Sequence, residues 1–281
     1  MYSSESWTLW RIICALGLCL ILLYGGLSIE LVMARTSETG DVNAFSSSDG
    51  TLRRIFAPVL MYHYISELPE DADDIRTELT VRPEQFDQHL RYLAESGYES
   101  ITSQELLHAL QFGAILPERP VILTFDDGHL DHYVHALPIL QRHGFSGTFF
   151  IITQFADESR PEHLNWAQIQ ALAQAGMSIE SHTKTHADLR NRSYDFLVYE
   201  LLGSIESIQA HINARVSSLA YPIGRYDENV LHIVRNTPIQ IAFTTRNGAY
   251  HTSDRLLELP RLRVSHHTSV NGLAALIQSA P

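Results

Sequence analysis

The chain has 281 residues, of which 45% are hydrophobic, and a formal net charge of −12. This length provides one ample domain and an appendage. The acidic balance argues against a nucleic-acid-binding protein and against polybasic attachment to anionic lipid, because both kinds of binding need basic surfaces.

The first expected element is one membrane-spanning helix within residues 1–35. Residues 12–29 carry no charge, tryptophans precede them, and the run is long enough to cross a bilayer. A cleavable signal peptide is the alternative, because Val32-Met-Ala34 offers a small-residue cleavage site. We expect an uncleaved anchor, because the run exceeds a typical signal-peptide core. Both interpretations predict an extracytoplasmic domain, either tethered to the cell membrane by a single span or secreted.

Both cysteines, Cys14 and Cys19, fall within this apolar run. Disulfides, thiolate zinc sites and cysteine nucleophiles are therefore excluded from the rest of the chain. Residues 36–55 are polar and rich in serine, which is typical of a flexible linker. The predicted domain occupies residues 56–281.

From residue 57 onward, short apolar strands alternate with helical patterns. The predicted strands are residues 59–63, 121–125, 147–152, 178–181, 219–221 and 241–244, and the predicted helices are residues 86–94, 134–143, 166–175, 194–215 and 229–236. This alternation predicts an α/β protein with a parallel sheet. About seven strands favour a barrel over an open sheet.

The predicted strand 121–125 runs directly into Asp126, Asp127 and Gly128. Adjacent carboxylates repel each other, and the end of a hydrophobic strand is a costly place for charge. Such a pair is expected where a cation or a reaction requires it. Because side chains alternate along a strand, the two acids would point in different directions and have different roles. A simple Asp-Gly turn is the alternative.

His182 and His186 follow the predicted strand 178–181. Their spacing predicts two imidazoles on one face of a helical turn, within reach of one metal ion. One carboxylate and two histidines form a common ligand set of hydrolytic metal sites. A solvated surface turn is the alternative. Because sites in α/β proteins lie at the carboxyl ends of strands, we expect the aspartates and histidines to meet there.

Together these motifs resemble the polysaccharide deacetylase family, also called the NodB-homology domain, over residues 56–267. Further similarity lies in the segments 58–65, 147–151 and 220–226. The Met61-Tyr-His63 opening and the Leu259-Pro-Arg261 ending are most similar to the branch that deacetylates poly-N-acetylglucosamine in biofilms. The resemblance implies a distorted (β/α)7 barrel.

The resemblance also implies a metal-dependent hydrolase that removes N-acetyl groups from an extracytoplasmic N-acetylglucosamine-type polysaccharide. A related amidohydrolase acting on a smaller amide is one alternative. An inactive carbohydrate-binding barrel is another. The expected partners are the polysaccharide and, through the N-terminal helix, the membrane. The sequence identifies no protein partner.

By resemblance, Asp127, His182 and His186 hold a divalent ion, with zinc expected and cobalt, nickel or manganese as alternatives. Asp126 would take a proton from the attacking water. His63 would be the general acid that protonates the departing nitrogen. A histidine near the C-terminal end, His267 beside His266, is the alternative acid.

The third family motif is altered in this chain. Many members have an arginine before the proline and an aromatic residue after it, whereas this chain reads Ala220-Tyr221-Pro222-Ile223-Gly224. By resemblance, the Ile223 backbone N–H would donate to the oxyanion, a role that tolerates any side chain. Tyr221 could stack on a sugar ring or be a core aromatic. Arg261 could replace the missing arginine beside Asp126, with a surface salt bridge as the alternative.

Overall fold

The structure, a computed structural model, describes residues 49–281. The predicted membrane helix and most of the predicted linker lie outside the described residues. Within residues 49–281, no helix combines the length and hydropathy that a membrane span requires.

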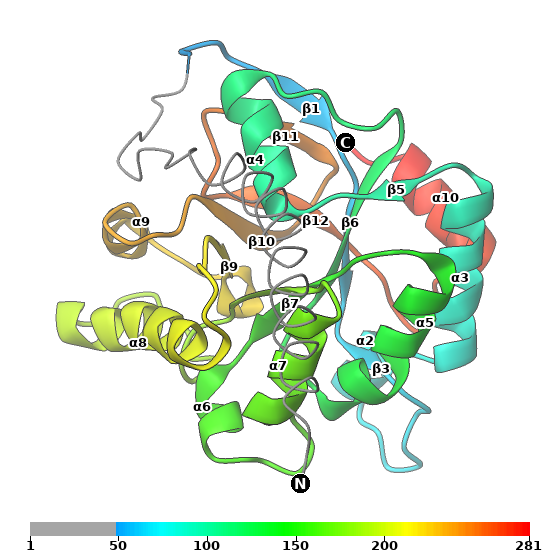
Figure 1. The fold of residues 1–281 in the computed structure, drawn as a ribbon, viewed down its shortest axis with the longest axis horizontal. Helices are drawn as coiled ribbons and strands as arrows, with labels where there is room; N and C mark the ends of the chain where they lie inside the picture. The colour runs from blue at the N-terminus through cyan, green and yellow to red at the C-terminus, as the bar shows by residue number, and fades with distance from the viewer. Residues whose placement is uncertain (1–48) are drawn as a thin grey trace, which may run out of the picture. The chain divides into compact units, whose positions relative to one another are not determined.

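Parallel strands close into a barrel around the molecular centre (Figure 1). In ring order these strands are β2 (Val59–Tyr62), β12 (Leu259–Arg263), β10 (Ile241–Asn247), β9 (Ser218–Ala220), β8 (Ser178–Ser181), β7 (Thr148–Ile151) and β6 (Pro120–Phe125). The ring closes because β6 also pairs with β2, with Val59 opposite Ile122. An eighth strand, β5 (Glu99–Ser100), extends the sheet from β6 outside the ring.

The seven-stranded ring confirms the predicted barrel of parallel strands. Its distortion is visible between β8 and β9, which share a single pairing of Ser181 with Leu219. Strand β12 was not among the predicted strands. It contains Pro260, which lacks a backbone N–H and usually marks a strand edge or a non-strand segment.

Helices surround the ring (Figure 1). The longer ones are α3 (Pro83–Glu95), α4 (Ser103–Phe112), α5 (Leu137–His143), α7 (Trp166–Gln174), α8 (Tyr194–Ile212), α9 (Glu228–Val234) and α10 (Val270–Gln278). Local sequence explains their ends. Capping boxes open α4 at Thr102 and α7 at Asn165, and Gly113 and Gly144 end α4 and α5 in left-handed conformations. The predicted helix 134–143 is divided into a π-helical segment, η1 (His132–Ala136), and α5.

Two small accessory sheets extend the barrel. Strand β1 (Arg54–Phe56) pairs antiparallel with β11 (Tyr250–Thr252). Residues 54 and 55 were assigned to the linker, but their backbone pairing places them in the folded domain. Strands β3 (Tyr64–Ile65) and β4 (Thr80–Val81) pair in parallel, and the excursion between them carries the helix α2 (Asp74–Leu79).

Alternation along the strands divides the core into two clusters. Val59, Ile122 and Phe150 belong to a cluster that also contains buried leucines of α4. Their neighbours Leu60 and Leu123 belong to a cluster that also contains side chains of the other longer helices. Side chains two residues apart share a face, so residues at even spacing from the strand residues of the first cluster also point into the barrel. This rule directs His63, Asp126 and Arg261 toward the inside of the barrel.

A candidate metal centre at the mouth of the barrel

Three predicted metal ligands meet beyond the carboxyl ends of β6 and β8. One donor atom from each of Asp127, His182 and His186 lies within 4.8 Å of the others. The Oδ1 atom of Asp127 is 3.3 Å from Nε2 of His182 and 3.4 Å from Nε2 of His186. Strand β7 lies between β6 and β8 in the sheet, so groups from two strands that do not pair directly meet at this end of the barrel.

These three residues fit a divalent ion. Oδ1 of Asp127 is buried and accepts no hydrogen bond within residues 49–281. Nδ1–H of His182 donates to the carbonyl of Ala220 at 2.7 Å, which leaves the Nε2 lone pair free to bind a metal. Burial acts to raise the pKa of Asp127, but the neighbouring imidazoles of His129 and His182 hold that pKa well below its ordinary value. The carboxylate is therefore charged.

The predicted helical turn between the two histidines is wrong. Residues 182–186 form a loop in which Thr183 has φ 67° and His186 has φ 63°. The buried Glu200 of α8 holds this loop, because its carboxylate accepts hydrogen bonds from the backbone N–H (2.9 Å) and the hydroxyl of Thr185. The four-residue spacing brings the imidazoles together through two left-handed residues instead of a helix.

Backbone strain is concentrated in the predicted site. Seven non-glycine residues within 49–281 have positive φ, and Asp127 (φ 75°), His186 and Ile223 (φ 57°) are three of them. For a β-branched isoleucine this conformation is a genuine outlier. Each such residue costs about 1–3 kcal/mol, and strain of this kind tends to gather at active sites.

Asp126 lies beside the metal ligands and is paired with Arg261 of β12. The guanidinium donates to both carboxylate oxygens, at 2.8 and 2.7 Å. Two further N–H groups donate to Thr124 Oγ1 and the Thr244 carbonyl. Arg261 has no exposed surface, so the surface-salt-bridge alternative is wrong. Burial acts to raise the pKa of Asp126, but the Arg261 charge and hydrogen bonds lower it to about 2.

His63 extends from the end of β2 toward the same carboxylate. Its Nε2 is 3.9 Å from Oδ2 of Asp126. Burial lowers the pKa of His63 to about 4, against the opposing effect of the two aspartate charges. His132 of η1 fixes the backbone here, because its Nε2–H donates to the His63 carbonyl. This placement brings His63 next to Asp126, and its role as the proton donor remains a prediction.

The alternative acid lies elsewhere. His267 is exposed and, with His266, lines a separate hollow beside α3. Their turn is pinned there because the Gln85 side chain donates to the His266 carbonyl at 3.1 Å. Within the described residues, neither histidine forms a hydrogen bond or ion pair with Asp126 or Asp127.

Comparison with known proteins agrees with this geometry. The family profile described as polysaccharide deacetylase matches residues 114–242. The YxkH protein of Bacillus subtilis, named provisionally as a polysaccharide deacetylase, is 32% identical over 222 residues, which cover 79% of this chain and 76% of YxkH. This chain belongs to the polysaccharide deacetylase family. It is therefore a hydrolase of the deacetylase class.

Other relatives of this deacetylase carry a more specific name. The poly-beta-1,6-N-acetyl-D-glucosamine N-deacetylases of Escherichia coli K12 and Staphylococcus aureus MSSA476 are each 22% identical to it. The matches cover 71% of this chain and 36% of the E. coli protein, and 66% of this chain and 68% of the S. aureus protein. The chain thus spans about a third of the length of the E. coli relative.

Solved structures share the fold. The Streptococcus pyogenes deacetylase PplD, in complex with acetate, has a TM-score of 0.74 and 29% identity over 80% of this chain and 99% of its own. IcaB from Ammonifex degensii has a TM-score of 0.70 and 24% identity over 79% of this chain and 97% of its own, which supports the fold alone. These structures agree with the distorted barrel.

The altered third motif forms a tight turn at the rim of the deacetylase site. Tyr221 has no exposed surface and stacks on Tyr226 at 4.7 Å, so stacking of Tyr221 on a sugar is wrong and the core interpretation holds. Ile223 is exposed in the 3-10 segment η2 (Pro222–Gly224). A Cβ at residue 224 would approach Thr245 N to 2.6 Å, so only glycine fits there. Donation by the Ile223 N–H to an oxyanion remains a prediction.

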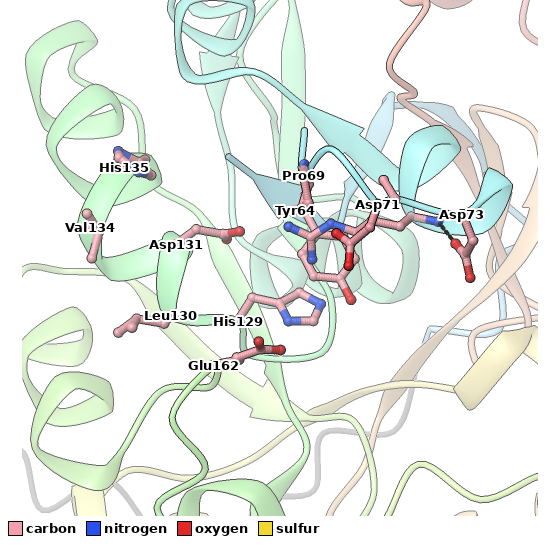
Figure 2. A pocket seen from close by; sticks show the side chains of 12 residues that line it. Tyr64, Pro69, Asp71, Asp73, His129, Leu130, Asp131, Val134, His135 and Glu162 are labelled. Atoms are coloured by element: carbon pink, nitrogen blue, oxygen red, sulfur yellow. Dashed lines mark hydrogen bonds between the residues drawn. The ribbon is translucent and has the colours of Figure 1, made fainter. Parts of the chain in front are cut away.

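Figure 2 shows a pocket of about 620 Å³. It lies beside the candidate metal centre. Its lining includes the carboxylates of Asp71, Asp131 and Glu162, together with Tyr64 and His129. His129 connects the pocket to the centre, because its Nε2 is 3.4 Å from Oδ2 of Asp127. Carboxylates accept hydrogen bonds from hydroxyl groups, so this lining is suited to a polyhydroxylated ligand.

Sequence reasoning missed Glu200 as the residue that holds the loop of residues 182–186, because a buried glutamate in a helix carries no local signal of its partner. We expect Glu200→Ala to lower the free energy of unfolding by about 1–3 kcal/mol, because it leaves the Thr185 donors unpaired. Without Glu200 the loop would no longer hold His186 in a fixed position, so we also expect the zinc affinity to fall. Denaturant unfolding and zinc titration measure both effects. Glu206→Ala, an exposed change in the same helix, is the matched control and should behave as wild type.

Proposed function

We propose that this deacetylase is metal-dependent and removes N-acetyl groups from an extracytoplasmic polysaccharide of N-acetylglucosamine type. The observation that carries the proposal is the ionised Asp126, held by Arg261 beside three converging metal donors. The names of the E. coli and S. aureus relatives support the polymer class. The apolar run at residues 12–29 supports a membrane-tethered protein whose domain lies outside the cytoplasm.

Hydrolysis of an acetamide needs a nucleophilic water, stabilisation of the developing oxyanion and a proton for the departing nitrogen. Asp127, His182 and His186 would hold the divalent ion, zinc or else cobalt, nickel or manganese. When bound, such an ion polarises a carbonyl and lowers the pKa of water toward neutrality. All other steps fall to residues of the chain itself.

Asp126 would accept a proton from water as its oxygen attacks the carbonyl carbon. The low pKa of Asp126 keeps it ionised and ready for this step. As the C–N bond breaks, protonated His63 would give its Nε2 proton to the nitrogen, and acetate and an amine leave. With a pKa of about 4, protonated His63 gives up its proton more readily than an ordinary imidazolium does. Only a small fraction of His63 is protonated at neutral pH. The Ile223 N–H would stabilise the oxyanion.

The complete set of Asp126, Asp127, His182 and His186 argues against an inactive carbohydrate-binding barrel. The pocket beside the metal centre supports a substrate that extends past the acetamide, because its carboxylates could bind the hydroxyls of a neighbouring sugar. Its volume is within the range of about 300–1,000 Å³ that is usual for ligand sites. A small-amide hydrolase has no use for such an extension.

The test is acetate release by the purified full-length protein from oligomers of β-1,6-linked N-acetylglucosamine. We expect release to stop after chelation and to return with zinc, cobalt, nickel or manganese. His182→Gln should bind no metal and release no acetate. The matched control His232→Gln, an exposed histidine in α9, should retain both properties. Release that is indifferent to chelation, or absent from every acetylated polymer tried with metal bound, would contradict the proposal.

A further inference from the structure

We propose that His129 is a positioning residue for the metal centre: stacked on Tyr64, it binds one oxygen of Asp127 so that the other faces His182 and His186. This inference rests on the proposed metal dependence and deepens it. It assigns a role to the excursion between β3 and β4, which belongs to none of the motifs that identify the family.

The two oxygens of Asp127 have different surroundings. Oδ1 faces the two histidine ligands, at 3.3 and 3.4 Å. Oδ2 faces Nε2 of His129 at 3.4 Å. His129 is outside the group of donors that lie within 4.8 Å of one another, so it acts on the carboxylate and not as a ligand.

The Nε2 of His129 faces Asp127 and has no other acceptor among the described residues. This atom is buried and forms no hydrogen bond within residues 49–281, and its contact with Oδ2 of Asp127 is a charged-group contact at 3.4 Å. The 3.4 Å separation is longer than an ideal N–H···O bond, so the contact is set mainly by how the ring is held. Two sets of interactions hold it.

The first set acts on the ring. His129 stacks on Tyr64 with ring centroids 3.7 Å apart and planes 22° apart, and both line the pocket (Figure 2). The Arg76 guanidinium lies 3.2 Å from the centroid of the same tyrosine ring. Arg76 in turn donates to Ser66 Oγ at 2.9 Å. Three planar groups from β3, α2 and the loop after β6 therefore form one column that ends at Asp127.

The second set acts on the backbone. The Leu130 N–H donates to the Glu162 carbonyl, and the Leu164 N–H donates to the Gly128 carbonyl, each at 2.9 Å. These bonds flank an isolated bridge between His129 and His163. Gly128 itself has φ 69°, and a Cβ there would meet the Ile151 side chain at 3.2 Å. The imidazole thus enters the site from a fixed backbone.

Residues that orient a metal ligand typically change metal affinity or activity by about 10- to 100-fold when they are replaced. We therefore expect His129→Phe in the full-length protein to bind Zn²⁺ about 10- to 100-fold more weakly, measured by competition with a chromophoric chelator. Phenylalanine keeps a flat ring against Tyr64 but removes the N–H. Tyr64→Phe, which keeps the column, is the matched control and should bind Zn²⁺ as wild type does.

Two further measurements separate positioning from a merely structural role. The absorption spectrum of the Co²⁺-loaded protein reports ligand geometry and should change in His129→Phe but not in Tyr64→Phe. His129→Gln retains an N–H donor and should recover part of the lost affinity. If His129→Phe does not fold, the proposal is tested through the Zn²⁺ affinity of His129→Gln and of Tyr64→Ala. The second of these variants removes the tyrosine ring that supports His129.

Wild-type Zn²⁺ affinity and an unchanged Co²⁺ spectrum in His129→Phe would overturn the inference, as would a loss of folding stability without a loss of affinity. The proposed function is judged separately, on wild-type protein. If the wild type needs metal to release acetate while His129→Phe binds Zn²⁺ normally, only the role of His129 fails. If the wild type binds no divalent ion, the metal centre itself is wrong.

Discussion

Asp126→Asn is expected to lower kcat/KM for acetate release by about 10²- to 10⁴-fold, the usual contribution of a positioned general base. The asparagine amide is nearly isosteric with the carboxylate but cannot take a proton from water. Asp127, His182 and His186 are untouched, so Zn²⁺ affinity should remain close to wild type. Initial rates and chelator competition on the same preparations measure both quantities.

The control for this change is Asp254→Asn, which neutralises an exposed aspartate outside the site. It should leave the rate and the Zn²⁺ affinity unchanged. Asp126→Asn will also destabilise the fold, because Arg261 loses its charged partner in a buried environment. Rates are therefore compared at a temperature where circular dichroism shows both proteins to be folded. A folded, metal-loaded Asp126→Asn with the wild-type rate would remove Asp126 from the mechanism.

Arg261→Met is expected to have the largest effect on stability, lowering the free energy of unfolding by about 3–5 kcal/mol at neutral pH. The change leaves Asp126 buried and charged without its partner. Burial alone raises the pKa of this carboxyl, whereas Arg261 now holds that pKa at about 2. In the variant the pKa of Asp126 should exceed its ordinary value of 3.8. The acid limb of the activity profile should therefore move to higher pH.

The sign of the stability effect follows from the same pKa. In the wild type the folded pKa of Asp126 lies below the unfolded value, so the pair stabilises the fold above about pH 4. That contribution is lost as the pH falls through the folded pKa of about 2. The stability difference between wild type and Arg261→Met should accordingly be largest near neutral pH and shrink in acid. Denaturant titrations across this range measure it.

Arg261→Lys is the comparison that separates charge from geometry. A lysine retains the positive charge but cannot donate to both oxygens of Asp126 as a planar fork does. It should keep the pKa of Asp126 low and recover only part of the lost stability. An Arg261→Met protein whose activity has the same pH profile as the wild type would contradict the assignment of Asp126 as the base.

Local pattern was sufficient to locate the strands that carry the site. Residues 178–181 form a strand with the predicted bounds, and β6 differs from its prediction by one residue. Strand β6 is a short apolar run that ends in polar residues, and that signal depends only on adjacent positions. Strand β8 has one apolar residue, Ile179, and its signal is weaker. The placement of Asp126, Asp127 and His182 at strand ends therefore followed from sequence. The conformation of the loop to His186 did not, because a four-residue spacing suits a helix and a left-handed loop equally.

Closure of the barrel decided the remaining assignments. Arg261 meets Asp126 because β12 lies between β10 and β2 and directs alternate side chains inward. Neither β10 nor β2 is the element next to β12 in the sequence. Pro260 prevented the recognition of β12 as a strand. Tyr221 belongs to the core cluster, and the ring of His129 beside Asp127 is held by Tyr64, a residue distant along the chain.

The amino-acid sequence by itself determined the family, the alternating α/β architecture and the acids and imidazoles expected at the site. Each of these features depends on residues that lie within short contiguous segments. Only the tertiary structure decided which arginine pairs with Asp126, which histidine lies beside it and which groups hold the loop of residues 182–186. The order of the strands in the barrel determines these partners. Contacts between segments that are distant along the chain produce no periodic pattern in the sequence.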